Sequence, residues 1–180
     1  MSNLVLIGFM GTGKSAVGRV LARRTNFRHL DTDAEIERRA EKTIPQIFAD
    51  EGEELFRGRE TALLSSLVKW HEEDGPLVLS TGGGTPLRPE NAKLLKRTGT
   101  VVWLQVAPEA ILARVAHSLH ERPLLAGHQA DPLGRIQSLL AAREQAYAAL
   151  ADVVLDTSDC ASSEEGAARL MERLSLRDHV

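Results

Sequence analysis

The fold is decided near the start of the chain by one stretch, Gly8-Phe9-Met10-Gly11-Thr12-Gly13-Lys14-Ser15, which satisfies the pattern G-x-x-x-x-G-K-[ST]. The stretch follows the apolar run Leu4–Ile7 and precedes a helical pattern that begins near Lys14, which is the context this motif requires. Its glycines let backbone N–H groups converge on phosphate oxygens, and the helix N-terminus adds its dipole. We therefore expect a phosphate-binding loop; the alternative is a glycine-rich turn without a ligand.

The side chains of this loop predict phosphoryl transfer or hydrolysis on a nucleotide. Lys14 is expected to reach the β- and γ-phosphates and to act in catalysis, while the Ser15 hydroxyl is expected to ligate Mg²⁺. The residues expected to bind the nucleotide here are Gly11, Thr12, Gly13, Lys14, Ser15 and Ala16.

Beyond the loop, short apolar runs alternate with longer helical patterns, which is typical of βα units around a parallel sheet. The expected strands are Leu4–Ile7, Arg28–Leu30, Leu77–Leu79, Val101–Val106 and Val153–Leu155. Helices are expected to begin near Lys14, Asp33, Glu53, Pro89, Pro108, Pro132 and Ser162, and the one from Glu53 is expected to reach about Trp70. Because no linker or repeat interrupts the pattern, we expect one α/β domain over residues 1–180.

Composition narrows the class of protein. A chain of 180 residues, with 43% hydrophobic and 26% charged residues, is long enough for one domain with a full core. The net charge of -3 and the 4% aromatic content argue against a nucleic-acid binder. A single cysteine excludes an intramolecular disulfide, no basic leader precedes Leu4, and no apolar run approaches the roughly 20 residues that span a bilayer. We expect a cytoplasmic protein that binds neither nucleic acid nor membrane.

Two carboxylates follow the second expected strand. Ligands of an open parallel sheet lie outside the carboxyl ends of its strands, and alternation along an extended segment places Asp31 and Asp33 on one face. One carboxylate can then hold Mg²⁺ through its water shell while the other accepts the proton of an incoming hydroxyl. The structural alternative for Asp33 is a capping box of Thr32 with Glu35, in which Asp33 only favours the helix dipole.

The long helical pattern carries a carboxylate on its apolar stripe. Glu60 lies between Phe56 and Leu63 at helical spacing, so it needs a partner. Arg57, three residues earlier, can supply one while directing its planar donors outward. The alternative is a solvated surface pair.

Three consecutive glycines, Gly82, Gly83 and Gly84, follow the third expected strand. Since glycine lets another molecule approach the backbone closely, we expect this turn to form part of a substrate surface. A plain flexible turn is the alternative.

Two arginines late in the chain are candidates for binding anions. Arg143 lies within about 40° of Tyr147 on the buried stripe of its helix, where a bidentate carboxylate is the natural ligand. Arg122 lies in segment 116–131, which lacks periodicity and predicts a mobile loop. It could close over the triphosphate as a lid and neutralise transition-state charge, and an ordinary loop arginine is the alternative.

Two other groups are not expected to carry chemistry. His117, His120 and His128 have no accompanying acidic or cysteine ligands for a metal ion. Cys160 has no accompanying base pattern, so we expect a small packing residue rather than a nucleophile.

The set GFMGTGKS, LDTD, FRGRE, STGGG, ERPLL and REQAY, in this order and spacing, resembles the shikimate kinase family over residues 4–155. The resemblance implies a P-loop fold of nucleoside monophosphate kinase type: a three-layer α/β/α arrangement with a five-stranded parallel sheet. It also implies a nucleotide lid at about 116–131 and a helical substrate-binding segment at about 33–61. The implied reaction transfers the γ-phosphate of ATP, with Mg²⁺, to the 3-hydroxyl of shikimate on the pathway to chorismate and aromatic amino acids. We expect a monomer.

The resemblance implies roles on the acceptor side, motif by motif. Asp33 matches the aspartate that contacts the acceptor hydroxyl and is a candidate base, and Asp31 matches the magnesium-side aspartate. Arg57 and Arg143 match the arginines that bind the shikimate carboxylate. The glycine triplet, Gly83 in particular, matches the turn that contacts the substrate.

The resemblance implies roles on the nucleotide side as well, with two departures. Arg122 matches the lid arginine on the ATP phosphates, and Arg114 resembles a residue placed along the adenine. Gln145 stands where many members have proline, and a helical residue there should leave Arg143 usable. The segment Ser158-Asp159-Cys160 lacks the basic residue that some members place beside the adenine, which bears on nucleotide affinity rather than on the acceptor.

Three rival classes differ in their residues. A gluconate kinase of the same fold lacks FRxxE with the triple glycine. A nucleotide-switch GTPase needs a guanine-reading N-K-x-D, which does not occur in this chain. A non-catalytic nucleotide-binding module would not need Asp33, Arg57 and Arg143 together.

Overall fold

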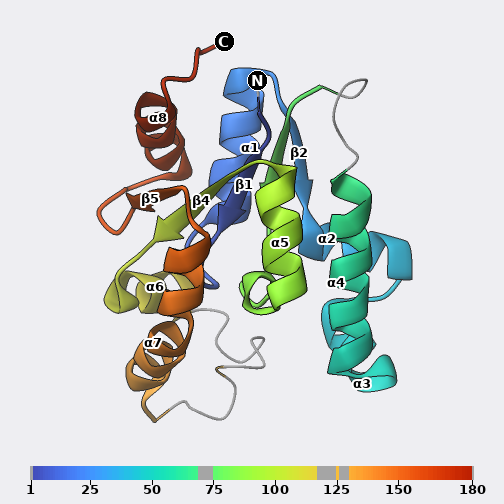
Figure 1. The fold of residues 1–180 in the computed structure, drawn as a ribbon. Coiled ribbons are helices and arrows are strands. Elements are labelled where there is room, and N and C mark those ends of the chain that lie inside the picture. Colours follow the sequence, from blue (N-terminus) through green and yellow to red (C-terminus); the bar gives the residue numbers. More distant parts are fainter. Residues whose placement is uncertain (1, 69–74, 117–124, 126–129, 180) are drawn as a thin grey trace.

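The structure, a computed structural model, describes residues 2–68, 75–116, 125 and 130–179. Its centre is a five-stranded parallel sheet in the order β2-β3-β1-β4-β5 (Figure 1). The strands are β1 Leu4–Ile7, β2 Arg28–Asp31, β3 Leu77–Ser80, β4 Thr100–Gln105 and β5 Val153–Asp156. All five predicted strands are confirmed, and their ends move by no more than one residue.

The helices fall between the strands as the alternating pattern predicts. They are α1 Lys14–Thr25, α2 Thr32–Ala40, α3 Ile44–Glu51, α4 Glu53–Leu67, α5 Pro89–Thr98, α6 Pro108–Val115, α7 Pro132–Leu150 and α8 Ser163–Leu174, with a 3-10 turn η1 Thr85–Leu87. Helix α4 ends at Leu67 rather than at Trp70, which lies outside the described residues.

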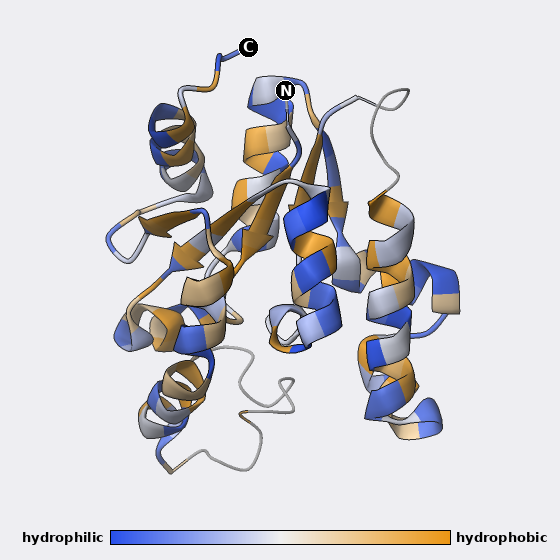
Figure 2. Cartoon of the chain, in the orientation of Figure 1, coloured by the Kyte–Doolittle hydropathy of each residue, from blue (hydrophilic) through white to orange (hydrophobic). Residues whose placement is uncertain are grey.

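Both faces of the sheet are buried: every residue of the central strands β1 and β3 is buried, and all of them except Ser80 are apolar (Figure 2). Along β1, Leu4 and Leu6 pack with the apolar side of α1 and α8. Val5 and Ile7 point to the other face and pack with α4, α5 and α7. Each core lies between the sheet and the helices on one of its faces, so the molecule has the three α/β/α layers that the resemblance implies.

Helix α3 is the one described α-helix that the sequence analysis does not predict. Its start carries a capping box: the Thr43 hydroxyl accepts from the Gln46 N–H at 3.4 Å, and the Gln46 side chain accepts from the Thr43 N–H at 2.8 Å. Pro45 occupies the first turn, where its missing N–H costs nothing. Thr43-Ile44-Pro45-Gln46 was therefore a readable start signal inside the segment 33–61.

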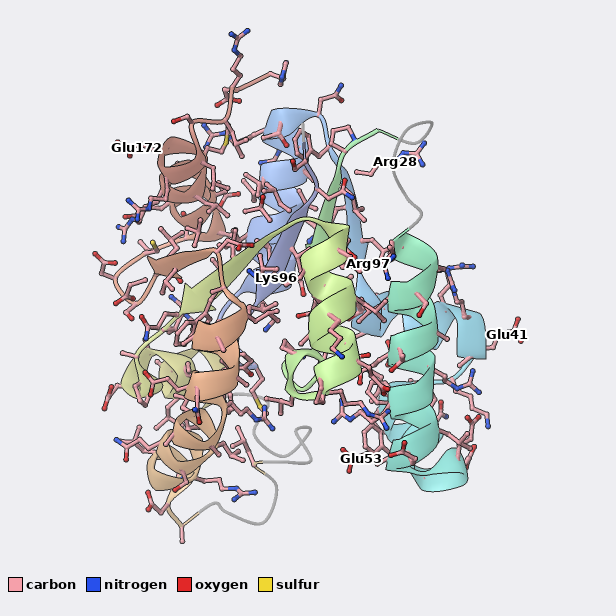
Figure 3. The ribbon with its side chains drawn as sticks, in the orientation of Figure 1. Arg28, Glu41, Glu53, Lys96, Arg97 and Glu172 are labelled. Carbon is pink, nitrogen blue, oxygen red and sulfur yellow. The ribbon has the colours of Figure 1, made fainter. Side chains whose placement is uncertain are left out.

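Parallel pairing brings the carboxyl ends of β1, β2 and β3 to one edge of the sheet. The phosphate loop follows β1, Asp31 ends β2, and the glycine triplet follows β3. Figure 3 shows Glu53, the first residue of α4, at this end of the molecule and Arg28, the first residue of β2, at the opposite end. No helix in the described part of the chain is long and apolar enough to cross a membrane.

Candidate active site

The loop between β1 and α1 has the geometry of a phosphate-binding loop. Gly11 and Gly13 have φ angles of 74° and 89°, which favour glycine, and Gly13 caps the start of α1. A Cβ on Gly8 would lie 2.6 Å from the Leu104 carbonyl oxygen on β4, so only glycine fits there. Backbone conformation and close contacts thus require glycine at these three positions of the loop.

The Lys14 side chain folds back over the phosphate loop. Its Nζ donates to the carbonyl oxygens of Gly8 at 2.9 Å and Phe9 at 2.7 Å, and the residue is buried. These contacts place the ammonium group over the loop, at the N-terminus of α1, where an anion is favoured by the helix dipole.

Ser15 and Asp31 are in direct contact, because the Ser15 hydroxyl donates to the Asp31 carboxylate. The other Asp31 oxygen caps α2 by accepting from the N–H groups of Asp33 at 3.0 Å and Ala34 at 3.3 Å. Asp31 is therefore fixed by its own helix with one oxygen directed at the phosphate loop. Both atoms of this pair are hard oxygen donors, the type that Mg²⁺ prefers.

The structural alternative for Asp33, a capping box of Thr32 with Glu35, is wrong. The cap is Asp31, and the Thr32 hydroxyl instead accepts from the Gly82 N–H at 3.0 Å. Glu35 forms ion pairs with Arg38 and Arg39 on the exposed side of α2. The capping alternative therefore does not account for Asp33.

Asp33 lies in the first turn of α2, so the expectation of an extended segment at this position is wrong. Its carboxylate still faces the site, because a Cβ on Gly82 would lie only 2.6 Å from Asp33 Oδ1. Burial, together with the nearby charges of Asp31 and Glu60, raises the pKa of Asp33 from 3.8 to about 6, and Lys14 acts in the opposite direction. A carboxylate with this pKa is ionised at neutral pH and can accept a proton readily.

Arg57 is held by two carboxylates of its own helix. Its Nη1 donates to Glu60 at 2.7 Å, and its Nη2 donates to Glu53 at 2.9 Å. The Glu60 side chain is 1% exposed and also accepts a hydrogen bond from the Thr85 hydroxyl. The alternative of a solvated pair is therefore wrong for Glu60, and the buried pairing is confirmed.

The glycine turn Gly82–Gly84 contacts three parts of the site. Gly82 lies against Asp33, a Cβ on Gly83 would lie 3.3 Å from the Met10 backbone nitrogen, and one on Gly84 would lie 2.9 Å from Arg57 Nη1. The Thr85 N–H donates to the Gly82 carbonyl at 3.2 Å, and η1 follows. This turn is an ordered surface rather than a plain flexible turn.

Arg143 lies on α7 with its guanidinium carbon 5.3 Å from the ring centroid of Phe9 in the phosphate loop. Among the described residues, no carboxylate forms an ion pair with it. One turn later, the buried Tyr147 hydroxyl donates to the Gly83 carbonyl at 2.6 Å. Arg143 is thus placed beside the phosphate loop with its charge not neutralised by a described acidic partner.

A cavity of about 250 Å³ lies against the phosphate loop, where Thr12 and Gly13 form part of its lining. Its walls include Ala16, Arg114, Thr157 and Cys160. Arg114 donates to the carbonyl oxygens of Thr12 at 3.4 Å and Thr157 at 2.8 Å, so it forms a fixed wall. Burial raises the pKa of the Cys160 thiol, which is consistent with a packing residue rather than a nucleophile.

Some predictions fall outside the described residues. These are Arg122, most of the lid at 116–131, and the histidines His117, His120 and His128. Within the described residues, no group of three or more acidic, histidine or cysteine side chains is arranged to hold a metal ion.

Three residues with clear contacts in the site were not predicted: Thr32, Thr85 and the Tyr147 hydroxyl. Each makes its contact through a hydroxyl to a residue at least 25 positions away in the chain. For Tyr147 the helical stripe predicted burial, and a buried phenol usually finds a hydrogen-bond partner. Its partner could not be named from the sequence.

Known proteins resemble this chain in both sequence and structure. The sequence profile of the shikimate kinase family matches residues 10–175. A shikimate kinase from Symbiobacterium thermophilum is 45% identical over 176 residues, which cover 97% of each chain. The structure of a shikimate kinase from Acinetobacter baumannii in complex with shikimate matches with a TM-score of 0.84 at 38% identity, covering 97% of this chain and 94% of that one. A shikimate kinase from Aquifex aeolicus matches with a TM-score of 0.78 at 34% identity, over 96% of both chains. This chain belongs to the shikimate kinase family.

Proposed function

We propose that this protein transfers the γ-phosphate of ATP to the 3-hydroxyl of shikimate, giving 3-phosphoshikimate and ADP. The observation that carries the proposal is the glycine turn, which contacts the phosphate loop through Gly83, Asp33 through Gly82 and Arg57 through Gly84. A substrate lying on this turn would therefore meet a proton acceptor, a cation and the phosphate site together. Family membership supports shikimate as that substrate.

The phosphate loop would bind the triphosphate. Its N–H groups and the N-terminus of α1 supply hydrogen-bond donors and a positive dipole, and Lys14 supplies a full charge. The cavity of about 250 Å³ beside Arg114 adjoins the phosphate loop and would receive the nucleotide base. We propose that Arg122 reaches the phosphates from the lid and neutralises charge in the transition state.

Ser15 and Asp31 are the residues that would hold Mg²⁺. Their contact juxtaposes a hydroxyl and a carboxylate oxygen at the start of α1, and Mg²⁺ commonly takes one or two protein oxygens together with phosphates and waters. Two protein donors therefore fit this ion. When bound, it would offset charge on the β- and γ-phosphates.

The chemical step is assigned to Asp33. The acceptor hydroxyl oxygen forms a bond to the γ-phosphorus as the bond from that phosphorus to the bridging oxygen of ADP breaks. The hydroxyl proton passes to Asp33, which the raised pKa equips to receive it. Lys14, whose ammonium lies over the loop, stabilises the charge that develops on the transferred group.

The shikimate carboxylate would be bound by Arg57 and Arg143. Glu60 and Glu53 fix the Arg57 guanidinium in one orientation, and Arg143 comes from a different helix, α7, with its guanidinium near the ring of Phe9. A planar donor set matches a carboxylate in bidentate fashion, which a lysine cannot do. The acceptor would therefore be selected by an anion at one end and a hydroxyl at the other.

A coupled assay of ADP release tests this function. We expect ADP release from ATP to require shikimate, and gluconate or nucleoside monophosphates at equal concentration to give no more than background. Mass spectrometry should detect one added phosphoryl group on shikimate. Turnover with gluconate but not with shikimate would contradict the proposal.

The raised pKa of Asp33 predicts a pH dependence. The free enzyme must hold Asp33 ionised to use it as a base, so kcat/KM for shikimate should fall as pH drops below about 6. At constant ionic strength and saturating ATP, the acid limb of the profile should have a slope of about one. A limb placed near pH 4, the range of an ordinary aspartate, would argue against Asp33 as the titrating group.

We further propose a monomer in the cytoplasm, with one domain over residues 1–180. Gel filtration of the purified protein at micromolar concentration should give an apparent mass close to the 19.7 kDa of the chain. An apparent mass of twice that value, unaffected by dilution, would contradict the monomer.

A further inference from the structure

Tyr147 ties α7 to the glycine turn at a single atom. Its side chain is fully buried, and its hydroxyl donates to the Gly83 carbonyl at 2.6 Å. Its ring packs against Trp103 of β4, with ring centroids 5.8 Å apart. The ring is held by the core while the hydroxyl reaches the site, so the position of the hydroxyl is well defined.

The glycine turn also packs closely against the phosphate loop, which leaves it little room to move. A Cβ on Gly83 would lie 3.3 Å from the Met10 nitrogen and 3.4 Å from the Gly8 carbonyl oxygen, so the turn packs directly on the phosphate loop. Gly83 is therefore held at two points, by the Tyr147 hydroxyl at its carbonyl oxygen and by the phosphate loop packed against its Cα. The glycines before and after it carry the contacts with Asp33 and Arg57.

Arg143 precedes Tyr147 by four residues on α7, so the two side chains lie on the same face of the helix, one turn apart. The hydrogen bond from Tyr147 thus sets the position of the glycine turn relative to Arg143. We propose that Tyr147 is a positioning residue that fixes the glycine turn relative to Arg143, so that an acceptor bound by its carboxylate presents its hydroxyl to Asp33. This inference rests on the proposed function.

The protonation state of Tyr147 suits this role. Burial raises the pKa of its hydroxyl, and the neighbouring Arg143 acts in the opposite direction without reversing the shift. The hydroxyl therefore remains a donor throughout the working pH range. Since a carbonyl oxygen can only accept, a phenylalanine in the same place would leave Gly83 without this partner.

The Tyr147→Phe variant tests the inference, because it removes one hydroxyl and keeps the ring against Trp103. We expect KM for shikimate to rise about three- to tenfold, the range of one lost buried hydrogen bond, while KM for ATP stays within about twofold. The matched control is Thr98→Val, which removes another buried hydroxyl-to-carbonyl bond, from Thr98 to Leu94, on α5. It should lower thermal stability without changing KM for shikimate.

A double-mutant cycle separates positioning from general loosening. In an Arg143→Ala background the arginine that the glycine turn is positioned against is gone and Arg57 alone remains for the carboxylate, so Tyr147→Phe should change KM for shikimate by less than about twofold. An unchanged KM in the single variant, or fully additive effects in the cycle, would overturn the inference. Both outcomes differ from failure of the proposed function, in which the wild-type protein itself shows no ADP release with shikimate.

Discussion

In the Asp33→Asn variant we expect kcat with shikimate to fall roughly 10²- to 10⁴-fold, the range that general-base catalysis contributes. The amide has nearly the same shape as the carboxylate but cannot take the proton of the acceptor hydroxyl. The nucleotide is bound mainly by the loop around Lys14, so KM for ATP should change little. Steady-state kinetics with both substrates varied measures the two effects together.

The same variant should be more stable than the wild type, although its kcat is lower. Above pH 6 the folded protein carries a buried charge that burial disfavours, since the pKa of Asp33 is raised from 3.8 to about 6. Removing this charge should raise the free energy of unfolding by about 1–3 kcal/mol at pH 8, as measured by urea denaturation. As pH falls through 6 toward 4 the wild-type carboxyl takes up its proton in the folded state, so the gain should shrink.

The control is Asp50→Asn on the exposed side of α3, where the carboxylate pairs with Lys42. This substitution should leave kcat unchanged and should not stabilise the protein. If Asp33→Asn kept full activity, Asp33 would not be the base; if it were both inactive and unstable, the loss would reflect misfolding instead of chemistry.

Much of the fold could be predicted because its signals are local. The phosphate loop, the apolar strands and the proline residues that begin α5, α6 and α7 each lie in one continuous stretch. Asp33, Arg57 and Glu60 could be placed because they sit at the carboxyl edge of the sheet or on a helical stripe. Helix α3 also has a local signal, the Thr43–Gln46 capping box, so its start too is encoded in one continuous stretch.

The parts of the site that could not be predicted depend on contacts between distant segments. A helical stripe indicates that Tyr147 is buried, but it does not indicate that the hydroxyl meets Gly83, 64 residues away. The hydrogen bond from Thr85 to Glu60 and the one from Gly82 to Thr32 have the same character. The error at Asp33 was local: β2 ends at Asp31, whose side chain starts the helix one residue sooner than alternation assumed.

Replacing Arg143 by Ala should have the largest effect on acceptor binding. If the guanidinium binds a desolvated carboxylate, its loss should weaken shikimate binding by about 2–5 kcal/mol, or roughly thirty- to several-thousand-fold. Titration calorimetry with shikimate, and KM for shikimate where turnover remains, would measure this change. Binding of ATP should be little affected, because the contact of Arg143 with the phosphate loop in the described structure is with the ring of Phe9.

Two further variants make the Arg143 result specific. Arg143→Lys keeps the charge but loses the planar pair of donors, so it should bind shikimate with an affinity between those of the wild type and the alanine variant. Arg173→Ala removes an exposed arginine from α8, on the other face of the sheet, and should change nothing. If both Arg143 variants bound shikimate as the wild type does, the carboxylate would have to be held by Arg57 alone. The Glu60 and Glu53 carboxylates that orient Arg57 also offset its charge, which is the physical reason to expect that a second arginine is needed.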